Sequence, residues 1–442
     1  MDRYDEQGMG EKTSPQASLE AGSDDRPKET GILATLRRFE GRMDKALGVE
    51  SHAIDRKMDA DKSPVKWHEE LTMALLWASG TMGISCFATG FLGWEFGLDL
   101  KRAIPIFIFG SILGGAVSGY CATFGAATGL RQISVSRFSF GWWPNKLIAF
   151  LNGVEQLGWA SVGSISGGLA LTAVADGRIS LVVVVYGSSA SWATMVSDYY
   201  VHYPTNVSRL KVFILTTLGI AIPTSFGMTA GAVVASSLNN QTAWANTYEN
   251  QGLGFLIRDM LHPRGFAKFL LVIFSFSGIN TNIISLYSAA ISFQQMARPF
   301  AKVPRFLWTL LCFAVVIGLA LGGRSQLNTY LQNFLSLLGY WCTSYFIILL
   351  MEHSIFRRGD FANYDLDGWN DPSRLPHGIG ASVAFLVGVV AWCMGMVETW
   401  FVGPLGGLIG ESGGDIANEM TLVVTAVVYL PARYLELKFF GR

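Results

Sequence analysis

Long apolar segments, separated by short polar ones, fill the chain from about residue 68 onward. A helix of about 20 apolar residues is long enough to cross the hydrocarbon core of a bilayer. The hydrophobic pattern therefore predicts an all-α integral membrane protein with ten spans. These segments are residues 71–94, 103–130, 147–175, 179–200, 212–237, 267–296, 306–323, 327–351, 378–400 and 416–432.

The positive charges between these segments predict the orientation of the chain. Cytoplasmic loops of membrane proteins carry an excess of Lys and Arg. With the polar N-terminal segment in the cytoplasm, 26 of the 33 Lys and Arg residues fall on that side. The sequence thus predicts a cytoplasmic N-terminal tail at 1–67, a transmembrane domain at 68–437 and a short cytoplasmic C-terminus at 438–442. The longest outside loop contains the sequon Asn240-Gln241-Thr242, so Asn240 is a candidate glycosylation site.

Composition agrees with a membrane protein and argues against several other classes. Half of the residues are hydrophobic and 15% are charged, whereas soluble domains are about 25% charged. The formal net charge is zero, so nucleic acid is not an expected partner. The sequence has no P-loop, no hydrolase motif and no His/Cys cluster with metal-ligand spacing. We therefore expect a non-enzyme without metal or cofactor, embedded in the lipid bilayer, with its oligomeric state left open.

The N-terminal tail contains one amphipathic stretch. From Ile32 to Val49, apolar residues recur at roughly helical spacing with basic residues among them. This pattern is typical of a helix that lies on a membrane surface. A solvated, weakly ordered helix fits it equally well, so both interpretations stay open.

Glu155 lies near the middle of the segment 147–175. A carboxylate at the centre of a bilayer costs about 2.5–3.5 kcal/mol on insertion scales, so its position needs a reason. Trp159 follows four residues later and shares its helix face. Two interpretations are about equally supported: a carboxyl satisfied by a neighbouring helix, or a protonatable group beside a solute site.

The segment 267–296 is unusually polar at mid-depth. It contains Asn280, Asn282 and Ser285 among further hydroxyl side chains. Such groups either join helices by hydrogen bonds or serve as donors and acceptors for a polar, planar ligand. Their density favours the ligand.

Two other segments carry features of a solute site. Ser85 lies among glycines in the segment 71–94, a pattern that indicates either close helix packing or an interrupted helix that exposes backbone groups to substrate. Trp192 lies about eight residues before the polar end of its segment. An interfacial tryptophan would lie nearer that end, which favours a ring that faces a cavity.

Several segments form longer motifs. The longest is Gly129-Leu-Arg-Gln-Ile-Ser-Val-Ser-Arg-Phe-Ser-Phe-Gly141, and it looks like the signature cytoplasmic loop of the purine–cytosine permeases in the nucleobase:cation symporter family. Ser191–Tyr199 and Val303–Trp308 agree with that family, and Phe356–Phe361 and Arg433–Glu436 resemble its fungal branch. The resemblance runs from about residue 68 to the C-terminus.

The resemblance implies a leucine-transporter-like fold, in which two inverted repeats of five helices are followed by two more. It also implies secondary active import of a purine or cytosine across the plasma membrane, in symport with a proton, by alternating access. In the family the base stacks between aromatic rings and amides bind its edge. Ser85, Trp159, Trp192 and Asn282 match its substrate-binding positions. Glu155 is the candidate proton-coupling residue.

Some positions depart from the family pattern. Gly163 stands where the family has an asparagine, and Ile284-Ser285 stands where it has Pro-Asn. Asn280 and Ser285 are partial substitutes for the two absent amides. A related heterocycle, such as a vitamin or allantoin, therefore becomes an alternative substrate.

The chain is also shorter than the family pattern of twelve spans. The difference falls near residues 182–187, where the sequence passes from the start of the family's fourth helix to the middle of its sixth. Loss of an even number of spans preserves the charge asymmetry described above. It also leaves an alternative function class: a degenerate or mis-spliced family member that does not transport.

Overall fold

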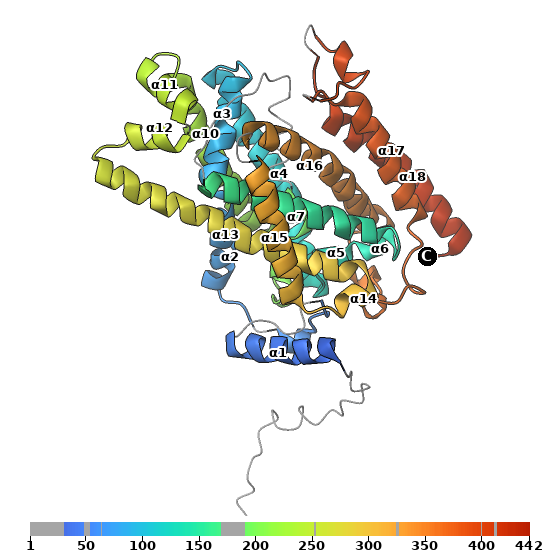
Figure 1. Ribbon diagram of the computed structural model, residues 1–442. Coiled ribbons are helices and arrows are strands. Elements are labelled where there is room, and N and C mark those ends of the chain that lie inside the picture. The colour runs from blue at the N-terminus through green and yellow to red at the C-terminus, as the bar shows by residue number, and fades with distance from the viewer. Residues whose placement is uncertain are drawn as a thin grey trace, which may run out of the picture.

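The described part of the molecule is a bundle of α-helices (Figure 1). The computed structural model describes residues 31–47, 54–62, 64–168, 191–251, 253–323, 327–398, 400–410 and 413–442. Its α-helices are α1 (Ile32–Leu47), α2 (Trp67–Thr81), α3 (Ile84–Glu95), α4 (Leu100–Thr128), α5 (Gln132–Val135), α6 (Arg137–Phe140), α7 (Asn145–Gly168), α9 (Ser197–Tyr200), α10 (Arg209–Ser237), α11 (Thr242–Gln251), α12 (Leu253–Met260), α13 (Arg264–Met296), α14 (Arg298–Ala301), α15 (Arg305–Gly323), α16 (Leu327–Met351), α17 (Ile379–Gly395) and α18 (Ala417–Phe440). A short 3₁₀ helix, η3 (Ser191–Thr194), precedes α9.

Among the described residues, five helices are long and apolar enough to cross a membrane: α4, α10, α15, α16 with the turn after it, and α18. Helices α2 and α3 together form a sixth span that is bent by 54°. Of the two interpretations of 71–94, the bend favours the interrupted helix, because Met82 and Gly83 have extended rather than helical backbone angles. Helices α7 and α13 cover most of the predicted segments 147–175 and 267–296.

The predicted segment 179–200 lies mostly outside the described residues. Its last ten residues contain only η3 and the four-residue helix α9. The predicted segment 378–400 is shorter as a helix, since α17 ends at Gly395, whose carbonyl accepts a hydrogen bond from the Ile416 amide at 3.1 Å. The chain there turns away into the next loop instead of continuing the helix.

The last helix is longer than its predicted segment 416–432. Helix α18 continues to Phe440 because its buried face continues past the apolar run. Arg433 and Glu436 are buried on that face, and the Glu436 carboxylate accepts backbone N–H groups at the start of α17, from Gly378 at 2.7 Å and Gly380 at 3.0 Å. A carboxylate at a helix N-terminus is favourable, so the pair fixes α18 to α17.

The described helices pack in three groups. Helices α2, α3, α4 and α10 form the first, α7, α13 and α15 form the second, and α16, α17 and α18 form the third. Small residues allow close packing in the first group: a Cβ added at Gly90 on α3 would overlap the Met228 carbonyl oxygen, and one at Gly231 on α10 would overlap the Phe87 carbonyl oxygen. Small residues at helix interfaces are the usual means of close packing in membranes.

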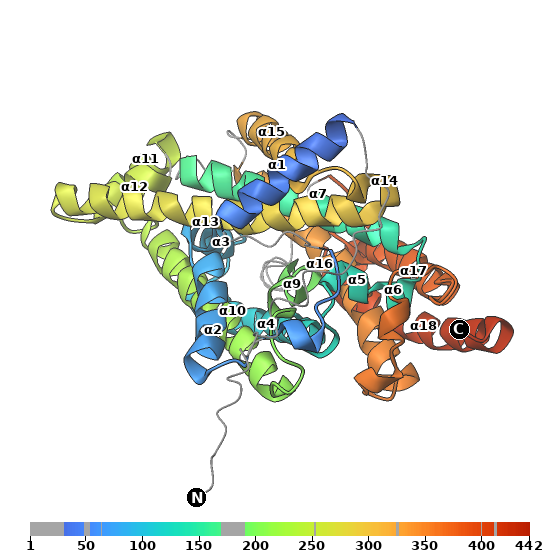
Figure 2. The ribbon, with the colours of Figure 1, turned by 90° about the horizontal axis from the view of Figure 1, so that it is seen from below.

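Helix α1 lies across one end of the bundle instead of running along it. Seen from below, it crosses α13 beside α15 (Figure 2). The Arg37 side chain donates hydrogen bonds to the carbonyl oxygens of Lys302 at 2.8 Å and Ala301 at 3.2 Å. The amphipathic stretch therefore forms a helix that packs against the protein, and we call this side of the molecule the α1 end.

Candidate functional site

A small cavity of about 40 Å³ lies at the break between α2 and α3. The break leaves the chain non-helical at Met82 and Gly83, so backbone groups are available there. Helices α7, α10 and α13 and the 3₁₀ helix η3 complete the walls. The lining residues are Gly80, Thr81, Gly83, Ser85, Cys86, Thr89, Trp159, Trp192, Thr224, Met228 and Thr281.

Two tryptophan rings face each other at this cavity. The rings of Trp159 on α7 and Trp192 on η3 have centroids 6.3 Å apart and an interplanar angle of 17°. Trp77 packs edge-on against Trp192 at 5.7 Å, and Phe334 packs edge-on against Trp159 at 5.9 Å. Gly158 makes room for Phe334, because a Cβ at residue 158 would overlap its ring. Packing from both sides thus fixes the two rings nearly parallel.

The space between the rings is too narrow for a stacked ligand in this arrangement. Carbon atoms in contact are about 3.5–4.0 Å apart, so a flat ligand between two rings needs ring planes about 7 Å apart. The 6.3 Å between the Trp159 and Trp192 centroids falls short of this, and 40 Å³ is far below the roughly 300 Å³ of an open ligand pocket. Trp159 belongs to the second helix group, whereas η3 packs against α4 of the first. Separation of the two groups would therefore widen the site.

The threonine hydroxyl groups near the rings donate hydrogen bonds to carbonyl groups of their own helices. The Thr89 hydroxyl donates to the Ser85 carbonyl at 2.9 Å, and the Thr81 hydroxyl donates to the Trp77 carbonyl at 2.9 Å. The indole Nε1 of Trp159 is buried and has no hydrogen-bond partner among the described residues. A buried donor without a partner costs about 1–3 kcal/mol, so an acceptor on a ligand would relieve this cost.

Two further predicted residues flank Trp159 on α7, one turn to each side. Glu155 is 1% exposed; its Oε2 accepts from the Cys342 thiol at 3.7 Å, and the Thr194 side chain lies beside it. Its Oε1 has no hydrogen-bond partner among the described residues. Gly163 is buried but does not line the cavity. The carboxyl is therefore next to the cavity and held by weak, neutral partners.

The predicted residues of α13 lie beside the cavity but do not line it. Asn280 donates to the Ser79 hydroxyl on α2 at 3.3 Å, while its neighbour Thr281 contributes to the lining. Asn282 and Ser285 lie further along the helix. The Ser285 hydroxyl is fully buried and has no hydrogen-bond partner in the described ranges. The cluster on α13 is thus partly an interhelical contact in this arrangement.

Comparison with known proteins identifies the family. A sequence profile described as a permease for cytosine/purines, uracil, thiamine and allantoin matches residues 66–180 and 171–408. The chain belongs to this permease family.

Two curated relatives cover most of the permease. It is 28% identical, over an alignment of 516 positions including gaps, to the vitamin B6 transporter TPN1 of Saccharomyces cerevisiae, with 90% of this chain and 89% of the relative covered. It is 30% identical, over an alignment of 477 positions including gaps, to the purine-cytosine permease FCY21 of Saccharomyces cerevisiae. This alignment covers 91% of this chain and 90% of the relative. The resemblance to fungal purine–cytosine permeases is confirmed.

A solved structure confirms the leucine-transporter-like fold. Mhp1, a nucleobase-cation-symport-1 family transporter in a closed conformation with bromovinylhydantoin bound, matches with a TM-score of 0.61 at 12% identity. The match covers 88% of this chain and 96% of that chain. At this identity the likeness shows the fold alone. The permease is a multi-pass membrane protein.

Sequence reasoning missed the contribution of α10 to the permease's cavity. Thr224 and Met228 line it, and the Thr224 carbonyl accepts from the Cys86 thiol at 3.3 Å. A signal was present, because α10 contains Pro223 at mid-depth, followed by the hydroxyl residues Thr224 and Ser225. Asn240 is exposed in the turn after α10, where glycosylation stays a prediction.

Proposed function

We propose that this permease is a secondary active transporter that imports a planar nitrogen heterocycle, stacked between Trp159 and Trp192. The nearly parallel ring pair at the break of a bent span carries the proposal. An aromatic ligand between two indoles gains stacking energy, and the Trp159 N–H supplies a donor to its edge. Ser85 and the backbone at the break lie within reach of the same cavity.

The substrate class is a nucleobase, a purine or cytosine, or a vitamin of similar shape such as vitamin B6. The relative named as a vitamin B6 transporter and the relatives named as purine-cytosine permeases are similarly distant from this chain. Gly163 and Ser285 bear no amide where the family pattern has one, which favours a substrate with fewer edge contacts than a nucleobase makes. Allantoin belongs to the same family description.

We propose alternating access by relative movement of the first and second helix groups. The ring pair joins the second group to the first, so a ligand between the rings couples their relative movement. We assign Glu155 as the proton carrier, because it lies one turn from Trp159 without a cationic partner in the part of the chain that the structure describes. Ionisable groups within spans commonly form proton relays. The charge asymmetry supports a cytoplasmic location for both termini, and we assign the permease to the plasma membrane.

The test is uptake by yeast cells that lack their own purine-cytosine and vitamin B6 permeases. Cells expressing the chain receive radiolabelled cytosine, adenine, hypoxanthine or pyridoxine at acid and neutral pH. We expect saturable uptake of at least one compound, faster at acid pH, and loss of that uptake in Trp192→Ala at equal surface expression. Uptake that Trp192→Ala leaves unchanged would remove the ring pair from the site.

A second function, binding without transport, is favoured by one observation. The family match comes in two pieces that overlap at residues 171–180, next to the gap predicted at 182–187. If helices of the first repeat are absent, the inverted repeats lose part of their mutual support. A version with a relative's segment inserted between Val185 and Tyr186 separates the two functions. Uptake only by the longer version would assign binding without transport to this chain.

A further inference from the structure

A second, larger cavity of about 470 Å³ lies at the α1 end. It is lined by residues of α1, α6, the end of α13, α14 and the start of α15, together with Ile54, Asp55, Trp142, Trp369 and Asn370 between the helices. Four guanidinium groups line it, those of Arg37, Arg137, Arg298 and Arg305. In contrast to the cavity between the tryptophan rings, this one has room for a ligand without any movement of the helices.

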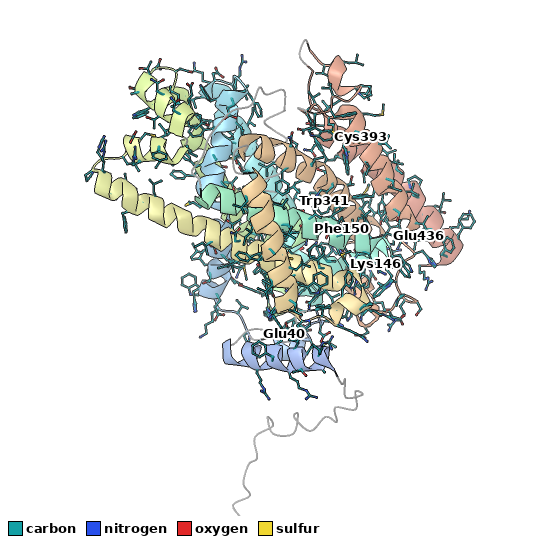
Figure 3. All side chains as sticks on the ribbon, viewed as in Figure 1. Glu40, Lys146, Phe150, Trp341, Cys393 and Glu436 are labelled. Carbon is teal, nitrogen blue, oxygen red and sulfur yellow. The ribbon has the colours of Figure 1, made fainter. Side chains whose placement is uncertain are left out.

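Helix α1 closes one side of this cavity through specific contacts. The Glu40 carboxylate accepts the backbone N–H of Arg305 at 2.6 Å and of Phe306 at 3.4 Å. It thereby caps the first turn of α15, where a negative charge is favourable. Figure 3 labels Glu40 on the side of α1 that faces the bundle. The Glu40 carboxylate at the cavity is therefore already hydrogen-bonded to the N-terminus of α15.

Arg137 is buried at the cavity with neutral partners. Its side chain is 4% exposed and donates to the Asn370 side-chain oxygen at 3.0 Å and the Trp369 carbonyl at 3.4 Å. Burial, together with the nearby charge of Arg298, lowers the pKa of Arg137 to about 10. Both guanidinium groups lie against the ring of Trp142, at 4.9 and 5.3 Å from its centroid. Two positive charges near one ring repel each other, and an anion beside them would offset this repulsion.

Gln295 contributes a further hydrogen-bond donor at the cavity. Its side chain is 7% exposed and its Oε1 accepts from the Ser134 hydroxyl at 2.8 Å. Its Nε2 is buried at the cavity and has no hydrogen-bond partner among the described residues. An unmet buried donor costs about 1–3 kcal/mol. The lining of the cavity thus offers N–H donors and positive charge to a ligand.

We propose that this cavity binds a phosphomonoester group, held by Arg137, Arg298 and the Gln295 amide. The planar guanidinium group matches phosphate oxygens in a bidentate manner. Four guanidinium groups face two carboxylates, Glu40 and Asp55, around the cavity. The excess of two positive charges matches a phosphomonoester, which carries about −1.5 to −2 at neutral pH.

Two sources can supply this group, a lipid headgroup or a soluble phosphate ester. Trp143 is 72% exposed next to the cavity-lining Trp142, and the Lys146 ammonium lies 3.7 Å from its ring centroid. An exposed tryptophan beside a lysine is typical of a membrane interface. The cavity therefore lies where a phosphoinositide headgroup of the cytoplasmic leaflet reaches, given the orientation proposed above.

The test uses the purified full chain in nanodiscs of phosphatidylcholine. Binding of inositol trisphosphate and of inorganic phosphate is measured by thermophoresis at low and high ionic strength. A second arm compares thermal unfolding in nanodiscs with and without a minor fraction of phosphatidylinositol phosphate. Binding or stabilisation that weakens with salt in either arm supports the proposal. A response in the first arm indicates a soluble phosphate ester, and a response in the second indicates a lipid headgroup.

Matched variants show whether the cavity is responsible. Arg298 is an exposed residue, so Arg298→Gln should fold. It should weaken the binding of the effective probe about tenfold or more, since hydrogen bonds to charged groups contribute about 1.5–3 kcal/mol. The control is Arg38→Gln, because Arg38 is an exposed arginine of α1 outside the cavity lining. This variant should change the affinity for the probe by less than about twofold, since exposed charges contribute little. No response to any probe, or equal losses in the two variants, would overturn the proposal.

Discussion

Two buried glutamates, Glu155 and Glu352, have opposite surroundings. Glu352, directly after α16, is fully buried and both of its oxygens are paired. Arg433 donates to Oε2 at 3.0 Å and to Oε1 at 3.1 Å. Tyr429 donates to Oε2 at 2.8 Å, and Arg357 donates to Oε1 at 3.1 Å. Glu155 is equally buried, but its partners are neutral, the Cys342 thiol at 3.7 Å and the Thr194 side chain, and its Oε1 has no hydrogen-bond partner among the described residues.

The difference separates a structural carboxylate from a functional candidate. Glu352 joins α16 to α18 as an ion-paired carboxylate, so its burial is explained by packing. Glu155 has no such compensation, and ionising a buried carboxyl without a cation is costly. The geometry therefore favours the second of the two interpretations of Glu155, a group that gains and loses a proton beside the ligand cavity.

The largest expected effect is that of Glu352→Ala on stability. Removal of one partner from a buried ion pair costs about 3–5 kcal/mol, a large part of a net stability of roughly 5–15 kcal/mol. We expect a much lower midpoint of thermal unfolding in detergent and little protein at the cell surface. An unfolding midpoint equal to that of the unmodified chain would show that the paired carboxylate does not stabilise the helices.

Glu155→Gln should instead spare stability and change the response to pH. The amide preserves the shape of the side chain but carries no transferable proton. We expect the ratio of uptake at acid pH to uptake at neutral pH to fall towards one, with the unfolding midpoint unchanged. If the pH profile is retained and the midpoint drops, Glu155 is a packing residue like Glu352 and the contrast between the two is lost.

Gly158→Ala tests whether packing behind Trp159 positions its ring. A Cβ at this position would push against Phe334, and overpacking costs about 1–3 kcal/mol. We expect weaker ligand affinity with nearly normal folding. The control is Gly318→Ala on α15, where an added Cβ meets nothing within 4 Å. Equal affinities in the two variants would show that Phe334 does not hold the ring in place.

The smallest effect is expected for Asp367→Asn, an exposed counterpart of Glu352. Asp367 is 78% exposed in its ion pair with Arg56, at 3.0 Å. Exposed pairs contribute about 0–1 kcal/mol, so the unfolding midpoint should barely move. A loss as large as that of Glu352→Ala would mean that burial does not explain the difference between ion pairs in this molecule.

Sequence predicted the helical spans well because bilayer insertion depends on local hydrophobicity. It offered a broken first span as one of two interpretations, and the family resemblance grouped Ser85, Trp159, Trp192 and Asn282, of which the first three line one cavity. It did not find Thr224 on α10 or the pairing of Glu352 with Arg433, because such contacts depend on which helices pack together. The cavity at the α1 end was likewise beyond sequence, since its four arginines come from four separate segments.

The most direct test of the central claim is equilibrium binding of radiolabelled cytosine and pyridoxine to the purified chain, because binding does not depend on whether the chain completes transport. Stacking of a base on an aromatic side chain contributes about 1–3 kcal/mol, so Trp159→Ala should weaken binding of the preferred compound about tenfold or more. Trp159→Phe should retain part of the affinity, and Trp400→Ala, an exposed tryptophan, should retain all of it. Undiminished binding by Trp159→Ala would contradict the account.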